Sequence, residues 1–166
     1  MSETFFSGQE IIEIKENQLD DLKVAATKAP LKRARFCLHH NLTDQVHEMI
    51  IAFCQESYIR PHRHTNKSES FHIIEGKLAV IFFDDEGNVT RQIKMGTVGS
   101  DSIFFYRLSS NLWHTVVPLS DFVIIHETTT GPFIKEESEF APWSPAVDDP
   151  KGIEKFLVEM LGNYER

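Results

Sequence analysis

The sequence predicts an all-β domain: a barrel or sandwich of short strands, with one helix packed outside it near each end of the chain. Strand-like apolar runs recur between residues 34 and 130 with turn residues between them, which is typical of all-β barrels and sandwiches. Helical spacing of apolar residues is found in one segment near each end. At 166 residues we expect one domain with a sizeable core.

Residues 1–33 should form an N-terminal strand and helix. Residues 9–16 alternate loosely and predict a short edge strand. Asn17 is a good N-cap, and Pro30 should end the helix that follows. The apolar residues of this helix recur three and four positions apart: Leu19, Leu22, Ala25, Ala26 and Ala29.

Residues 34–130 should form the barrel. An extended entry segment at 34–40 is followed by strands predicted at 46–53, 58–64, 70–75, 77–83, 89–94, 102–108, 113–118 and 121–127. Residues 84–88 should close a hairpin, because Gly87 can adopt the left-handed conformation that such a turn needs.

Residues 131–166 should form a wrapping loop and a C-terminal helix over 151–163. The helix carries an apolar stripe formed by Ile153, Phe156, Leu157, Met160 and Leu161. We expect this stripe to pack on the barrel; the alternative is a contact in a dimer.

Composition excludes several functions. A net charge of −8 argues against a nucleic-acid surface, and the basic residues at 32–35 are too few to change that. No apolar run is long enough to span a membrane, and the first ten residues lack the features of a signal peptide. Cys37 and Cys54 form no paired motif. We therefore expect a cytoplasmic protein.

The strongest motif lies between residues 58 and 76. His62 and His64 are two positions apart, Glu69 follows five positions later, and Gly76 follows seven after that. Residues of like parity on a strand share a face, so both imidazoles should point the same way. Two imidazoles and a carboxylate make a divalent-metal site. The chance of this spacing arising from composition alone is on the order of 10⁻³.

His62, His64, Glu69 and Gly76 resemble the first motif of the cupin superfamily. That resemblance implies a jelly-roll-like barrel, the double-stranded β-helix, which holds a metal ion. A second cupin motif contributes one more histidine, and LSSNLWHTVVP places His114 there. Across residues 31–145 the chain is similar to WbuC-type cupin metalloproteins, which are often encoded among surface-polysaccharide genes.

The resemblance implies a metal set of His62, His64, Glu69 and His114. Three imidazoles and one carboxylate leave two positions open on an octahedral ion. This donor set suits Fe(II), Mn(II), Ni(II) or Zn(II), and the sequence does not choose among them.

Other residues could face a bound ligand. Arg60 and Tyr58 share the parity of His62, and an arginine would suit a carboxylate or phosphate. Either Tyr106 or its neighbour Arg107 should face inward, Tyr106 being the candidate for contact with substrate.

A proton-transfer base is less well defined by the sequence. His126 lies on a strand that is apolar on both faces, so it is either a base candidate or a hydrogen-bonded core histidine. Glu48 is a second candidate for the base, on the strand at 46–53.

These residues support two functions. The first is a metal-dependent enzyme acting on a small oxygenated molecule such as a sugar, as an isomerase or epimerase, or as a dioxygenase if the ion is Fe(II). The sugar follows only from the resemblance. The alternative is a non-catalytic module that binds a saccharide or organic acid; a purely structural metal is a weaker possibility. We expect a homodimer, because such barrels often pair their exposed edges.

Overall fold

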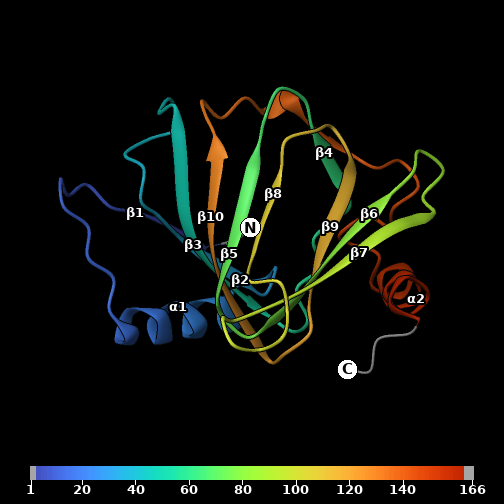
Figure 1. Cartoon of the computed structure of the whole chain (residues 1–166), viewed down its shortest axis with the longest axis horizontal. Coiled ribbons are helices and arrows are strands. Elements are labelled where there is room, and N and C mark those ends of the chain that lie inside the picture. Colours follow the sequence, from blue (N-terminus) through green and yellow to red (C-terminus); the bar gives the residue numbers. More distant parts are fainter. Residues whose placement is uncertain (1–2, 163–166) are drawn as a thin grey trace.

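The computed structural model describes residues 3–162 as two facing β-sheets with a helix outside each (Figure 1). The strands are β1 (Glu3–Phe6), β2 (Arg33–Cys37), β3 (Val46–Cys54), β4 (His62–His64), β5 (Glu69–Glu75), β6 (Lys77–Phe83), β7 (Val89–Gly96), β8 (Phe105–Leu108), β9 (Trp113–Pro118), β10 (Phe122–Thr130) and β11 (Ser138–Phe140). The helices are α1 (Glu16–Lys28), α2 (Pro150–Leu161) and the 3-10 turn η1 (Lys135–Glu137).

One sheet has the order β1-β2-β3-β10-β5-β8, and the other has the order β11-β4-β9-β6-β7. Strands β1 and β2 pair in parallel, whereas the other neighbours are antiparallel. The inner faces of both sheets supply the main core, which includes Phe71, Val80 and Ile125. This arrangement confirms the predicted all-β barrel.

Strands β3 and β10 are apolar on both faces because each face is covered. They pair along their whole lengths, from Phe122 opposite Cys54 to Thr130 opposite Val46. Ile51 and Ile125 point into the barrel core, while Ile50 and Ile124 pack outside beneath α1. A strand buried on both sides reads as a continuous apolar run, which hides its orientation in the sequence.

Helix α1 covers the outside of the first sheet with Leu22 and Ala26. It begins at Glu16, so the predicted N-cap at Asn17 was wrong; the N–H of Lys15 instead donates to Gln18 Oε1 over 2.9 Å. The last helical residue is Lys28, consistent with the stop expected at Pro30.

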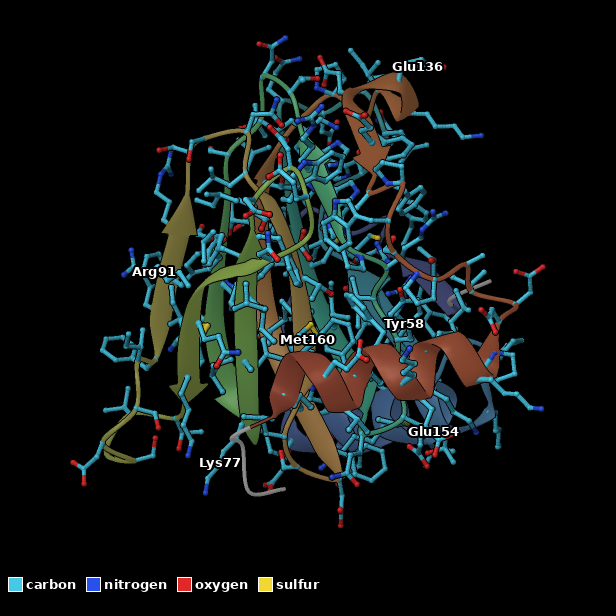
Figure 2. All side chains as sticks on the ribbon, turned by 90° about the vertical axis from the view of Figure 1, so that its right-hand side faces the viewer. Tyr58, Lys77, Arg91, Glu136, Glu154 and Met160 are labelled. Carbon is cyan, nitrogen blue, oxygen red and sulfur yellow. The ribbon has the colours of Figure 1, made fainter. Side chains whose placement is uncertain are left out.

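Helix α2 lies across the outside of the second sheet (Figure 2). Asp149 caps it by accepting a hydrogen bond from the N–H of Gly152 at 3.0 Å. Met160 and Leu161 are buried against Ile81 and its neighbours, so the predicted stripe packs on the barrel. The predicted helix end at residue 163 lies outside the described residues.

Three predicted strands differ from the structure. Residues 9–15 are irregular, and the N-terminal strand is Glu3–Phe6. Of the segment 58–64, only His62–His64 is a strand, and the segment 102–108 pairs as a strand only from Phe105. Neither helix of residues 3–162 is long and apolar enough to cross a membrane.

Gly76 makes the tight turn from β5 to β6. Its φ of +82° belongs to the left-handed region, and a Cβ at this position would collide with the carbonyl oxygen of Phe122. The motif therefore needs glycine here both for its backbone angle and for space.

Candidate metal centre

Three histidines converge inside the barrel from two neighbouring strands. His62 and His64 lie on β4, and His114 lies on β9 directly opposite His62. One nitrogen from each of the three rings falls within 4.8 Å of the others. The predicted shared face of His62 and His64 is present because β4, although short, is a regular strand.

Each of the three imidazole rings is oriented by a hydrogen bond at its Nδ1 atom. Nδ1 of His62 lies 2.9 Å from the carbonyl oxygen of Arg60, and Nδ1 of His114 lies 2.9 Å from that of Leu112. A carbonyl can only accept, so both Nδ1 atoms carry the hydrogen and both Nε2 atoms keep a free lone pair. Nδ1 of His64 contacts Ser138 Oγ at 2.9 Å on the paired strand β11.

Glu69 completes the group from the first residue of β5. Its side chain is buried, with Oε1 2.9 Å from Nε2 of His114 and Oε2 3.7 Å from Nε2 of His64. Despite this short distance, the geometry forms no hydrogen bond, and both Oε1 of Glu69 and Nε2 of His114 are buried without a partner among the described residues. Two buried acceptors without a donor are costly, and a cation between them would satisfy both. The residues present therefore fit a divalent metal ion.

The protonation states suit a metal as well. Burial, aided by the nearby His114, lowers the pKa of His62 to about 3, and burial also lowers the pKa of His64. Burial raises the pKa of Glu69, but the neighbouring imidazoles outweigh it and lower the pKa overall. For His114, burial lowers the pKa and the Glu69 carboxylate more than offsets this, so the pKa is raised. The lowered pKa values keep His62 and His64 neutral, whereas the raised pKa of His114 favours a proton that a bound metal ion would displace.

Arg60 and Tyr58 lie away from this centre. Nε of Arg60 donates to Ser144 Oγ over 2.9 Å, and its guanidinium also contacts the carbonyl oxygen of Ala141 at 3.2 Å. The Tyr58 hydroxyl donates to the carbonyl oxygen of Pro145 over 2.9 Å, and Tyr58 lies beside α2 (Figure 2). Both predictions of ligand contact need correction, because parity holds only within a strand and residues 58–61 precede β4.

His126 and Glu48 also point away from the centre. They lie on the outer face of the first sheet with Ile50 and Ile124, and His126 Nε2 lies 3.6 Å from Glu48 Oε1. Neither can act as a base inside the barrel. Glu127, the next residue along β10, is the one that faces inward.

Glu127 on β10 and Tyr106 on β8 lie in register on the inner face of the first sheet, with Phe71 of β5 between them. Glu127 is opposite Met49 on one side and Phe71 on the other, and Phe71 is opposite Tyr106. Tyr106 is buried, whereas Arg107 points outward to Ser68 Oγ at 3.1 Å. The structure thus resolves which member of the Tyr106–Arg107 pair faces in.

Sequence reasoning missed Glu127, which is the inward acid closest in register to Glu69. Burial and the charge of Glu69 raise the pKa of Glu127 to about 7, although Arg35 lowers it in part. Arg33 and Arg35 on β2 are also inward-facing residues that the sequence did not identify. The register of β10 against β3 and β5 shows the face of Glu127, and the register of β2 against β3 shows that of the two arginines.

A polar pocket of about 390 Å³ adjoins the centre at one end of the barrel. Its lining residues are His64, Asn66, Lys67, Ser68, Ser109, Ser110, Asn111 and Thr130. Since His64 belongs to both, the pocket borders the metal centre at this residue.

Comparison with known proteins supports the fold. A family model described as a domain of unknown function, DUF6016, matches residues 14–95, slightly less than half of the chain. No curated protein sequence is significantly similar to the chain.

Several solved structures share the fold at low sequence identity. Oxalate oxidase in complex with the substrate analogue glycolate is 13% identical over 83% of this chain and 77% of its own, with a TM-score of 0.53. The protein TT1209 from Thermus thermophilus is 16% identical over 72% of this chain and 97% of its own, with a TM-score of 0.51. SO0799 from Shewanella oneidensis is 12% identical over 59% of this chain, with a TM-score of 0.50, and the match spans 63% of that protein.

The chain therefore has the cupin fold, the double-stranded β-helix, with helices packed outside it. At these identities the likeness concerns architecture alone. The resemblance to WbuC-type proteins, the homodimer and the cytoplasmic location stay predictions.

Proposed function

We propose that this chain is a metal-dependent enzyme that moves a proton on a small oxygenated substrate bound inside the barrel. The observation that carries the proposal is a pair of buried atoms, Glu69 Oε1 and His114 Nε2, which have no hydrogen-bond partner within residues 3–162 and lie beside two further imidazoles. His62, His64, His114 and Glu69 would hold Fe(II), Mn(II), Ni(II) or Zn(II). Such an ion, when bound, polarises a carbonyl or hydroxyl oxygen of the substrate as a Lewis acid.

Glu127 is our proposed general base. It lies on the inner face of the sheet that carries Glu69. Glu127 is opposite Phe71, two residues along β5 from Glu69. Burial raises the pKa of Glu127 to about 7, so its carboxyl group can both accept and return a proton near neutral pH. This residue replaces His126 and Glu48 in that role.

Tyr106 is our proposed hydrogen-bond donor to the substrate. Its hydroxyl is buried and has no hydrogen-bond partner among the described residues. Burial and the charge of Glu69 raise the pKa of Tyr106, so it stays protonated and can donate. A donor and a base on the same inner sheet face, with Phe71 between them, suit isomerase or epimerase chemistry; if the ion is Fe(II), a dioxygenase is the alternative.

The polar pocket supports a hydroxylated substrate such as a sugar derivative. Ser68, Ser109, Ser110 and Thr130 supply hydroxyl groups, and Asn66 and Asn111 supply amides. Each of these groups both donates and accepts hydrogen bonds, as the hydroxyls of a sugar require.

Hydrogen exchange with solvent tests the proposal. The metal-loaded protein would be incubated in D₂O with a panel of aldoses, ketoses and hydroxy acids, and loss of carbon-bound proton signals followed by NMR. We expect exchange in at least one compound, slowed about 100-fold or more in Glu127→Gln. Glu75→Gln, on the same strand as Glu69 but paired outside the barrel with Lys23 at 2.9 Å, should keep the parental rate.

Two outcomes would contradict the proposal. A parental rate in Glu127→Gln would remove Glu127 as the base. A metal-loaded parent that neither exchanges hydrogen nor consumes oxygen with any compound would favour the non-catalytic binding module.

A further inference from the structure

Two arginines share the inner face of strand β2. Arg33 is opposite Phe53 and Arg35 is opposite Ile51, and both of these partners belong to the barrel core. Cys37, two residues further along the same face, is buried in that core as well. The arginines therefore face the same interior as Glu127 and the histidines.

Neither guanidinium has a counterion in the part of the chain that the structure describes. Among residues 3–162, no carboxylate oxygen lies within 4.0 Å of Arg33 or Arg35, and Nε of each is buried without a hydrogen-bond partner. The polar contact that Arg35 makes is from Nη1 to Met49 Sδ, at 3.7 Å. By contrast, Arg63 pairs with Glu139 at 2.7 Å.

This arrangement is unfavourable without a ligand. Both arginines are half-buried, and burial together with the charge of Arg35 lowers the pKa of Arg33 to about 10. A buried charge is normally paired, because desolvation is otherwise uncompensated. Two guanidinium groups on one strand face, two residues apart, present several N–H donors toward the same space.

Glu127 does not neutralise the pair. It forms no ion pair with either arginine, and its pKa lies above the usual range for a carboxyl group even though both arginines lower it. In the sheet order β2-β3-β10-β5, the strand that carries Glu127 lies between the strand of the two arginines and the strand of Glu69. The inner face of β2 next to Glu127 is therefore positively charged, owing to Arg33 and Arg35.

We propose that Arg33 and Arg35 form an anion-binding site, which holds a carboxylate or phosphate group of the substrate. The substrate of the proposed enzyme is thus a small acid: its anionic end contacts the arginines and its oxygenated end reaches the metal centre. This second half of the proposal rests on the proposed function, whereas the anion site does not.

The positions of the two groups in the sheet set the length of the ligand. Strands β2 and β5 are separated by β3 and β10, which makes three strand spacings, or about 14 Å. Arg35 lies in the row of Ile51, Ile125 and Ile73, and Glu69 is four residues from Ile73 along β5, which adds about 13 Å along the strands. The two backbones are therefore about 19 Å apart, and the ligand must span the part of this distance that the Arg35 and Glu69 side chains leave open.

Melting temperature measures the anion site directly. Inorganic phosphate and malonate would be added separately, at 10 mM and constant ionic strength, to the parent, Arg33→Gln, Arg35→Gln and Arg91→Gln. Arg91 is the matched control, because it is exposed on β7 (Figure 2). For an anion at ten times its Kd, we expect a rise of about 4 °C in the parent and in Arg91→Gln, and no rise in the other two variants.

Two further measurements separate the possible failures. The same titration with His62→Ala, which lacks one metal ligand, should still show the rise, so that the anion site is tested even if the metal centre fails. Without added anion, Arg33→Gln should melt at or above the parental temperature, because it removes a half-buried cation that has no counterion among residues 3–162. Greater response to phosphate than to malonate, or the reverse, identifies the anionic group.

No rise with either anion in the parent would overturn the proposal. A rise that persists in both arginine variants would overturn it too, as would an Arg33→Gln protein that melts well below the parent without anion, since the arginine would then be structural.

Discussion

Replacing Glu127 with glutamine should make the metal-free protein more stable at alkaline pH. Glutamate in an unfolded chain titrates near pKa 4.5, whereas burial and the charge of Glu69 raise the pKa of Glu127 in the folded chain to about 7. Between these values the folded state binds a proton that the unfolded state has lost, so this contribution to stability is fully present below pH 4.5 and is lost as pH rises through 7.

The size of this effect follows from the two pKa values. At about 1.4 kcal/mol per pH unit, the difference amounts to about 3 kcal/mol of unfolding free energy. Glu127→Gln keeps the shape of the side chain but cannot ionise. We therefore expect the variant and the parent to be alike near pH 4, and the variant to be more stable by about 3 kcal/mol at pH 8.

Urea denaturation from pH 4 to pH 8, with a chelator present, measures this difference. Ile125→Val is the matched control: it lies two residues away on the same buried face and should cost about 1 kcal/mol at every pH. A difference between Glu127→Gln and the parent that does not change with pH would refute the reasoning, as would a variant that is less stable at pH 8.

Three further predictions concern the fold and the support of the metal centre. Gly76→Ala should lower the melting temperature by about 5 °C or more in a thermal scan, because its φ of +82° and a nearby backbone carbonyl leave no room for a Cβ; an unchanged melting temperature would contradict this. Ser138→Ala should weaken metal affinity about tenfold in competition with a chelator, because it removes the hydrogen-bond partner of His64; unchanged affinity would show that this contact does not orient the ring. Met160→Ala should cost about 2 to 4 kcal/mol in urea denaturation, whereas Val158→Ala, which is exposed on the same helix, should cost little; equal costs would argue against the packing of α2.

The strands that the sequence predicted best are those with clear limits. Lys77–Phe83 and Trp113–Pro118 form over the predicted residues, because each is an apolar run bounded by turn residues. The histidines at 62 and 64 share a face for the same local reason. These features depend only on residues that are close in the chain, so they can be predicted from the sequence.

The inward-facing polar residues depend on contacts between distant strands. The direction of His126 and Glu127 is decided by the register of β10 against β3 and β5, and both faces of β10 are apolar in sequence. Likewise, Arg33 and Arg35 form a short basic cluster in sequence, and only the pairing of β2 with β3 places them on the inner face. Such pairing between strands is not encoded in the local pattern.

The central claim is that His62, His64, His114 and Glu69 bind one divalent metal ion. Elemental analysis of untagged protein, compared with His62→Ala, His114→Ala and His126→Ala, tests it most directly. We predict close to one equivalent of metal in the parent and in His126→Ala, whose histidine lies on the outer face, and almost none in the other two variants. A parent without metal even after reloading, or equal metal content in all four proteins, would contradict the account.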